Sequence, residues 1–329
     1  MLLLQVIVGG LLLGAIYALF SSGLTLIWGM MNFINFAHGE FVMLGMYVAL
    51  LVVVWLGGGP AVFGLAAAIA LALLGVVIYF ALIRHVTRGP MLAQILSTFG
   101  LALLLRYTAF WIFSANIVSL PQTSLSGTLN IFGILVPVAQ LVSGIAAAAL
   151  TIAMHLFLTG TTIGSKLLAV AEDRNAAMLM GIRPDRMQAL AWGLAAAGAG
   201  IAGALMAISY PWSPSVGETF GLMAFVVVTF GGFGSVPGAM YAGLAIGLIQ
   251  AYSAYRFGPI YKDIIVYGLF VALLWFPAAY VVVIIGLIHV LWAGFLQHQW
   301  ASLIYQDAIV YGLIVALLWF RPQGLLGKA

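Results

Sequence analysis

The chain has 329 residues, of which 65% are apolar and 5% are charged, and its formal net charge is +4. A soluble domain carries about 25% charged residues because water must wet its exterior, so this composition excludes a soluble protein and indicates one embedded in a bilayer. The absence of cysteine excludes disulfides, a thiolate nucleophile and a cysteine-bound metal. The small net charge does not indicate a nucleic-acid partner.

Long apolar runs, separated by short breaks, predict the membrane segments. Six are each long enough to cross, or nearly to cross, about 30 Å of hydrocarbon, namely residues 2–20, 41–56, 61–83, 91–113, 131–158 and 187–208. Five shorter runs follow, at residues 220–230, 239–252, 264–276, 278–296 and 304–320. Because open strands would leave backbone groups unpaired in lipid, we expect helices. The predicted fold class is an all-α polytopic integral membrane protein, a bundle of roughly 8–11 transmembrane helices with broken or re-entrant segments.

The loops between these runs predict the orientation of the bundle. Lys and Arg occur in residues 84–90 and gather in residues 166–186, whereas residues 114–130 carry no charge and residues 209–218 carry only Glu218. An excess of Lys and Arg marks the cytoplasmic side of a membrane protein. The first two loops are therefore expected inside and the last two outside.

The glycine-rich stretch at residues 231–238 decides the topology of the C-terminal part. We interpret it as a turn between two crossings, which leaves Arg256 and Lys262 outside. If it were instead a kink within one crossing, these two residues would be inside, but the C-terminal tail would fall on the wrong side.

Residues 166–186 form a segment, called here the charged segment, that holds seven of the chain's 18 charged residues. We expect a short helix with Ser165 as its N-cap and Gly181 as its stop. On one continuous helix, two apolar stripes would lie on nearly opposite sides: Ala169, Ala176 and Met180 on one, and Leu167, Ala171 and Met178 on the other. A helix resting on a bilayer has one apolar face, so two stripes suggest cover by the bundle and by a cytoplasmic partner. The alternative is a solvated loop that obeys the positive-inside rule.

Two groups of polar or glycine residues interrupt the apolar runs and are candidates for a translocation path: Asn32, Asn35, His38 and Glu40, and then Gly232, Gly234 and Ser235. A polar solute needs partner groups inside a membrane, and the start of a half-helix is a recurrent way to provide them. The first group also fits helix capping and hydrogen bonding within the bundle, and the second fits close helix packing.

Arg106 lies inside an apolar run, where it can be functional, reach the interface, or pair with a carbonyl.

No catalytic or nucleotide-binding constellation is present. The pattern G-x-x-x-x-G-K-[ST] is missing, because residues 160–166 and 324–328 have the wrong spacing. The five histidines have no metal-ligand spacing and H-E-x-x-H is absent. We therefore expect no enzyme activity, no cofactor and no metal site, and an intramembrane hydrolase is disfavoured.

Three stretches carry a resemblance to a known family. GAIYALFSSGLTLIWGMMNFINFAHGEFVMLGMYVA (14–49), AFVVVTFGGFGSVPGAMYAGLAIGL (224–248) and RPQGLLG (321–327) resemble, in the same order, the branched-chain amino acid permeases of ABC importers, the LivH/LivM type. The resemblance implies one permease domain over residues 1–329 in the cytoplasmic membrane of a bacterium or archaeon. It also implies four kinds of partner: a second permease, two ATP-binding subunits that carry ATP and Mg²⁺, an extracytoplasmic binding protein, and the bilayer.

The same resemblance gives roles to residues of the charged segment. Residues 159–187 look like the coupling loop on which the ATPase docks, and the residues assigned to coupling are Glu172, Asp173, Arg174, Ala176, Ala177, Met178 and Gly181. The loop departs from the general importer pattern, because Asn175 replaces a glutamate and no Leu-Pro follows.

Branched-chain amino acids are the expected substrates; urea or short amides are carried by close relatives. A self-sufficient channel or secondary transporter is the competing class.

A repeat marks the C-terminal part. YKDIIVYGLFVALLWF (261–276) returns as YQDAIVYGLIVALLWF (305–320), with thirteen of sixteen positions identical at an offset of 44. An insertion of that length holds two crossings, so we expect a two-helix insertion around residues 277–320 that returns the tail to its original side.

Overall fold

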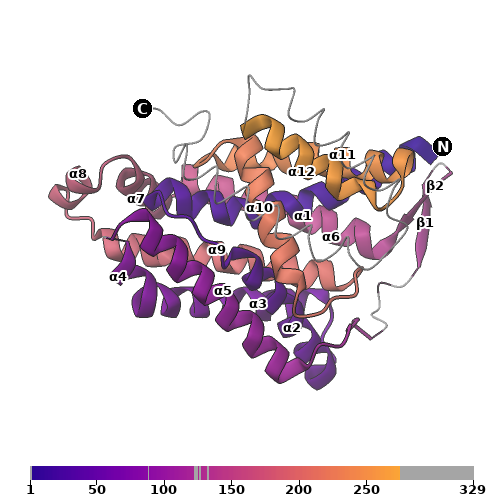
Figure 1. Cartoon of the computed structure of the whole chain (residues 1–329), viewed down its shortest axis with the longest axis horizontal. Coiled ribbons are helices and arrows are strands. Elements are labelled where there is room, and N and C mark those ends of the chain that lie inside the picture. The colour runs from indigo at the N-terminus through magenta and orange to yellow at the C-terminus, as the bar shows by residue number, and fades with distance from the viewer. Residues whose placement is uncertain (1, 88, 122–124, 126, 132, 275–329) are drawn as a thin grey trace, which may run out of the picture. The chain divides into compact units, whose positions relative to one another are not determined.

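The computed structural model describes residues 2–87, 89–121, 125, 127–131 and 133–274. They are mostly helical (Figure 1), which confirms the all-α polytopic class. The contacts divide the chain into two compact units, Met1–Ala251 and Tyr252–Ala329. The expected insertion at residues 277–320 lies outside the described residues.

The helices of the described part are α1 (Leu2–Met31), α2 (His38–Leu56), α3 (Pro60–Ile78), a π-helical turn η1 (Tyr79–Ile83), α4 (Arg84–Val86), α5 (Met91–Phe113), α6 (Val138–Gly160), α7 (Thr162–Glu172), α8 (Arg174–Leu179), α9 (Pro184–Ala207), α10 (Val216–Gly231), α11 (Val236–Phe257) and α12 (Tyr261–Leu274). Two short strands, β1 (Thr128–Ile131) and β2 (Ile134–Pro137), pair antiparallel with Thr128 opposite Pro137. This hairpin takes up the start of the apolar run expected at residues 131–158, so α6 begins only at Val138.

Six helices of the described part are long and apolar enough to cross a membrane, or seven if the bent pair α10–α11 counts as one crossing. Two of the eleven expected segments, residues 278–296 and 304–320, lie outside the described residues. α10 and α11 meet at 115° across the glycine-rich stretch and qualify as a crossing only as a pair, so the turn is sharp, while the two crossings expected there stay a prediction.

The end of α1 corrects one expectation, because the helix does not stop at Phe20 but continues for a further eleven residues to Met31. Ser21, Ser22 and Thr25, the hydroxyl residues that follow Phe20, are all buried inside the bundle. The hydroxyl of Ser22 donates to the carbonyl of Ala18 at 2.6 Å, so the helix itself satisfies this polar side chain.

Helix α9 lies at the centre of the first unit and packs against α1, α2 and α3. Small residues allow the backbones to approach closely. A Cβ built at Gly45 of α2 would meet the backbone of Gly200 in α9, and one at Gly203 would meet the backbone of Val42. Such approach gains dispersion contacts where no hydrophobic force acts between helices in lipid.

Helix α11 packs along α1, and glycines again allow the two backbones to approach closely. A Cβ at Gly14 would meet the backbone of Gly243, and one at Gly247 would meet the backbones of Gly10 and Gly14. As the residue number rises in α11, its neighbours lie nearer the start of α1, so the two helices are antiparallel.

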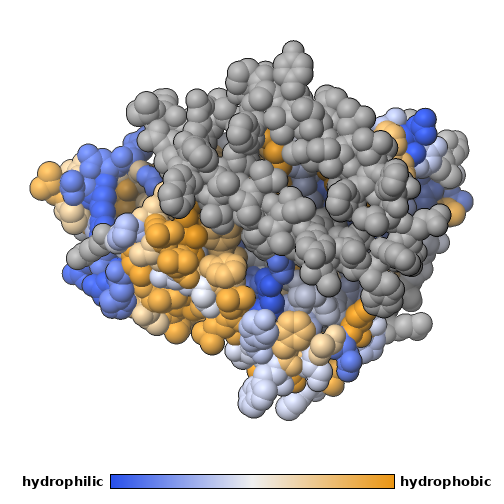
Figure 2. Space-filling model, viewed as in Figure 1, coloured by the Kyte–Doolittle hydropathy of each residue, from blue (hydrophilic) through white to orange (hydrophobic). Residues whose placement is uncertain are grey.

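The two ends of the first unit differ in character. The short helices α4, α7 and α8 lie at one end, and the β1–β2 hairpin lies at the other (Figure 1). Figure 2 shows hydrophilic surface gathered over the end that carries α4, α7 and α8, next to a broad hydrophobic face. The two loops expected on the cytoplasmic side therefore lie together.

Candidate functional site

An ion network lies inside the bundle, on three membrane helices. Arg106 of α5 donates through Nη2 and Nε to Glu40 Oε1 of α2, at 2.6 and 3.0 Å. Its Nη1 donates to Glu218 Oε2 of α10 at 2.6 Å. The side chains of Glu40, Arg106 and Glu218 are only 1%, 16% and 21% exposed. One guanidinium therefore joins two carboxylates from helices that are distant in sequence.

Glycines bring the two carboxylates to the same place. A Cβ at Gly39 would meet the backbones of Gly217 and Gly221, so the first turns of α2 and α10 touch through their main chains. Glu40 and Glu218 each lie in the first turn of their helix. The close approach leaves room for their side chains to converge on Arg106.

The network corrects two sequence interpretations. Glu218 is not a loop residue, because α10 begins at Val216. Arg106, for which the sequence left a function, the interface or a carbonyl partner open, pairs with two carboxylates. An acidic residue just after Ser215 was an available signal for a helix start, whereas nothing in the spacing indicated the partners of Arg106.

The residues between α1 and α2 form non-helical backbone that is mostly buried, which is tolerated at membrane depth only inside protein or beside water. Asn35 Oδ1 accepts from the amide of Ala37 at 3.1 Å, and the ring Nε2 of His38 bonds the carbonyl of Phe20 at 2.7 Å. The hydroxyl of Thr98 in α5 donates to the carbonyl of Ile34 at 3.2 Å. These contacts are the capping and bundle hydrogen bonds that the sequence offered as the alternative to substrate contact.

Some polar atoms of this group have no hydrogen-bond partner among the described residues. They are Asn35 Nδ2, His38 Nδ1 and Glu40 Oε2, all buried. Asn32, the remaining candidate, is exposed and adopts a positive φ of 49° directly after α1.

The second candidate group is the turn between α10 and α11. Gly232 and Gly234 have φ of 86° and 85°, which favours glycine. Thr25 Oγ1 of α1 accepts from the amide of Gly234 at 2.8 Å and lies 3.5 Å from the carbonyl of Gly232. Ser235 Oγ accepts from the amide of Gly238 at 3.0 Å. The turn is thus fastened to α1 by its own polar groups.

Glu40 of the first candidate group lies far from the glycines of the second. Glu40 meets the first turn of α10, whereas Gly232 and Gly234 follow its last turn. At 1.5 Å per residue, this puts them about 20 Å apart along α10. Glu40 and the turn therefore do not share one binding site in this conformation.

The charged segment forms two helices rather than one. The side chain of Thr161 caps α7 by accepting from the amide of Gly164, and Asp173 caps α8 by accepting from the amides of Asn175 and Ala176. Ser165 is therefore not an N-cap but lies inside α7, as its hydroxyl donates to the carbonyl of Thr161. Gly181, the expected stop, follows the end of α8 with a φ of 79°. Asp173 was readable as a cap from its residue type.

The break at Asp173 also rearranges the two expected stripes. Leu167 and Val170 of α7 and Ala177 of α8 are buried in one cluster. Its other members come from four membrane helices and are Leu26, Met30, Leu158, Ala191 and Val236. Met178, expected on the same stripe as Leu167, is exposed instead. The buried side chains fix the charged segment to the bundle.

The opposite side of α8 is free in this structure. Leu179 and Met180 are 89% and 82% exposed, and Figure 2 shows a small hydrophobic area at the outermost tip, over α8. Ala176 and Glu172 are also exposed. Exposed apolar side chains are thus gathered at the tip of a charged surface.

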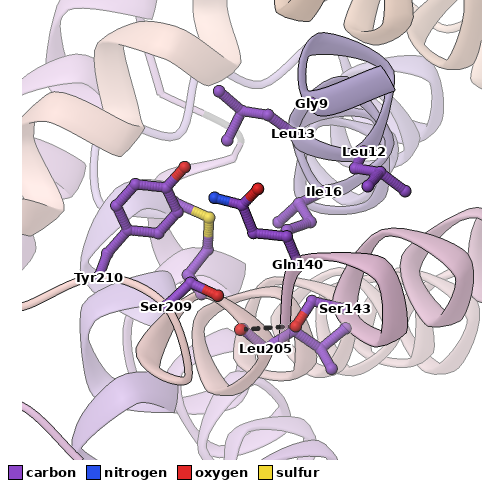
Figure 3. Close-up of a pocket in the computed structure, with 10 residues that line it drawn as sticks. Gly9, Leu12, Leu13, Ile16, Gln140, Ser143, Leu205, Ser209 and Tyr210 are labelled. Atoms are coloured by element: carbon purple, nitrogen blue, oxygen red, sulfur yellow. Dashed lines mark hydrogen bonds between the residues drawn. The ribbon is translucent and has the colours of Figure 1, made fainter. Parts of the chain in front are cut away.

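A small cavity lies between α1, α6 and the end of α9 (Figure 3). Gln140 and Tyr210 point into it, and Ser143 Oγ at its edge donates to the carbonyl of Leu205 at 3.1 Å. Burial raises the pKa of Tyr210, so its phenol stays neutral and can donate. The cavity measures about 10 Å³, which admits about one water molecule. It is too small for an amino acid.

Within the described part of the chain, no three His, Asp or Glu side chains gather to hold a metal ion.

Comparisons with known proteins place this arrangement in context. Residues 6–274 match the family described as "Branched-chain amino acid transport system / permease component". The chain is 31% identical to the high-affinity branched-chain amino acid transport system permease protein BraD of Pseudomonas aeruginosa, over 83% of this chain and 93% of that protein. It is 31% identical to LivH of Escherichia coli K12, over 82% and 92%, and 27% identical to a probable LivH of Methanocaldococcus jannaschii, over 88% and 93%. No solved structure matches.

Proposed function

Because the chain belongs to the family of branched-chain amino acid transport system permease components, we propose that it forms one half of the membrane path of an ATP-driven importer of branched-chain amino acids. It is a multi-pass membrane protein. Two ATP-binding subunits would supply the energy, a second permease would complete the path, and an extracytoplasmic binding protein would deliver the solute. The chain itself needs no cofactor, since ATP and Mg²⁺ would bind the partner, and the membrane is the cytoplasmic one of a bacterium or archaeon.

The observation that carries this proposal is that α7 and α8 pack against the bundle on one side and are exposed on the other. Leu167, Val170 and Ala177 hold them against the bundle, while Leu179 and Met180 stand in water. A helix pair with one face anchored and one apolar tip exposed can receive force from a soluble partner and pass it on, because packed side chains shift together rather than deform.

The buried cluster around Leu167, Val170 and Ala177 connects α8 to the turn between α10 and α11. Val236, which packs in it, is the first residue of α11 and directly follows the glycine-rich turn. Leu26 and Met30, in the same cluster, flank Gly29, whose backbone lies against Gly234. A displacement of α8 would therefore reach the turn between α10 and α11 through contacts with α1. α10 carries it to Glu218 and the ion network at its other end.

The decisive experiment compares uptake and ATPase binding. The complex is reconstituted in liposomes with both permeases, the ATP-binding subunits and the binding protein. Leu179→Asp is expected to lower co-purification of the ATP-binding subunits and ATP-dependent leucine uptake about tenfold or more, as loss of an exposed apolar anchor does at interfaces. Ala177 is unsuited to this test because it is buried against the bundle.

Leu129→Asp is the matched control, since Leu129 is an exposed leucine on β1, at the opposite end of the unit. It should leave binding of the ATP-binding subunits unchanged. If the chain alone carries leucine down a gradient as fast as the full complex does with ATP, it is a channel or secondary transporter and the proposal is wrong. Uptake of urea or acetamide, but not leucine, would assign the alternative substrate class.

A further inference from the structure

The cytoplasmic end of the first unit holds a groove to which the proposed function assigns no ligand. It lies between α8, the end of the α3–η1–α4 helix and the start of α9, with a volume of about 660 Å³. Its charged lining consists of Arg84, Arg174, Arg183, Arg186 and Asp185. Four guanidinium groups thus face a single carboxylate, which leaves three positive charges unmatched.

Asp185 already uses its two oxygens. Oδ2 lies 3.2 Å from Nη2 of Arg84, and Oδ1 accepts from Nη2 of Arg174 at 3.1 Å. Arg183 and Arg186 are exposed and form no ion pair with any described residue. The carboxylate therefore orders two guanidinium groups, and the other two remain available to an anion.

The other lining of the groove is apolar. Phe80, Met178 and Ile182 contribute to its wall, and Phe80 is itself exposed on the outer surface of the bundle. A site for a freely diffusing anion gains nothing from such a wall. A site for an amphiphile needs both parts, since its charged head and its chain must be matched in one place.

The level of the groove in the bilayer also favours an amphiphile as its ligand. The helix from Pro60 to Val86 has 27 residues, whereas about 20 residues cross the hydrocarbon. Its last turn, with Arg84, therefore reaches the headgroup region. Arg183 and Arg186 stand at the start of the neighbouring membrane helix α9, which spans Pro184–Ala207.

We propose that this groove binds the phosphate of an anionic phospholipid of the inner leaflet, with the guanidinium groups on the headgroup and Phe80 and Met178 beside the acyl chain. Basic pockets between membrane helices on the cytoplasmic side are suited to such headgroups. Arginine matches phosphate through paired donors in a fixed fork. Because Arg174 and Met178 belong to α8, the bound lipid stabilises the helix that the ATP-binding subunit is proposed to contact.

The test counts lipids on the full chain without any ATP-binding subunit, so its result is independent of the proposed function. Purified, delipidated protein in detergent is titrated with phosphatidylglycerol or phosphatidylcholine, and bound lipid is measured by native mass spectrometry. We expect phosphatidylglycerol to bind about tenfold tighter or more. In Arg183→Ala/Arg186→Ala its affinity should fall about 30-fold, since each basic group near an anionic surface contributes about fivefold.

Two further variants keep the result interpretable. Arg183→Lys/Arg186→Lys keeps the charge and should bind phosphatidylglycerol within a few-fold of the wild type, which shows that the site tolerates substitution. Arg256→Ala/Lys262→Ala removes the same charge from residues that do not line the groove, and should bind like the wild type.

Three outcomes overturn the proposal. Equal affinity for the two lipids, or an equal loss in both alanine variants, means that the groove does not recognise an anionic headgroup. Unchanged binding in Arg183→Ala/Arg186→Ala means that the lipid binds elsewhere. If millimolar inorganic phosphate displaces phosphatidylglycerol, the groove is a site for free anions and the lipid assignment is wrong.

Discussion

Replacing Arg106 by methionine removes the guanidinium from the ion network but keeps a long apolar side chain in α5. Glu40 and Glu218, which accept from Arg106 at 2.6 to 3.0 Å, are then left facing each other. Glu40 cannot turn to water, because its side chain is only 1% exposed, and the side chain of Glu218 is only 21% exposed. The cost arises from charge left unpaired in a medium of low polarity, rather than from the loss of one contact.

The expected size follows from this burial. Breaking a buried ion pair by removing one partner destabilises proteins by about 3–5 kcal/mol, whereas removing all partners together is often nearly neutral. Arg106→Met should therefore lower the free energy of unfolding by about 3–5 kcal/mol. The triple variant Arg106→Met/Glu40→Gln/Glu218→Gln should recover most of that loss, because no unpaired charge remains.

The assay is equilibrium unfolding of the purified chain in mixed micelles of dodecylmaltoside and SDS, followed by far-ultraviolet circular dichroism. Arg84→Met serves as the control, since its ion pair with Asp185 is half exposed and should contribute at most about 1 kcal/mol. Wild-type stability in Arg106→Met, or a triple variant as unstable as the single one, would refute the reasoning. Uptake by a stable triple variant then shows whether the network also serves transport.

Two further outcomes follow from packing and capping. Gly39→Ala should destabilise the chain by about 1–3 kcal/mol in the same unfolding assay, because its Cβ would meet the backbones of Gly217 and Gly221. Gly64→Ala is the control and should be neutral or stabilising, since a Cβ there meets nothing within 4 Å. Asp173→Ala should destabilise α8 by about 1 kcal/mol through loss of the N-cap. Amide hydrogen exchange should then become faster in residues 175–180 and stay unchanged within α9. Exchange in α8 equal to that of the wild type would contradict the role of Asp173 as the cap.

The sequence predicts the elements of this fold well where composition and local rules decide. Within the described part of the chain, the apolar runs are helical apart from the hairpin at the start of residues 131–158, because backbone groups in lipid must pair within their own segment. The glycine-rich stretch at 231–238 became a sharp turn, since Gly232 and Gly234 adopt positive φ. The end of α1 was missed, as buried hydroxyls such as that of Ser22 bond their own helix and do not mark a break.

The site was less accessible to sequence reasoning because its contacts are long-range. Glu40 and Glu218 lie 66 and 112 positions from Arg106, and no periodicity links such residues. The fold of the charged segment turned on one local event, the break at Asp173. With that break, Leu167 and Met178 no longer share a side, although one continuous helix would have put them together. The docking role of the charged segment and the assignment of the translocation residues stay predictions.

The meeting of α2 and α10 at their first turns has an electrostatic consequence. Two helix starts that touch through Gly39 and Gly217 bring together two ends that each carry about half a positive charge. Glu40, Arg106 and Glu218 together carry one formal negative charge. The ensemble of three side chains and two helix ends is thus close to neutral, so it can remain within a bilayer without a counter-ion from either side.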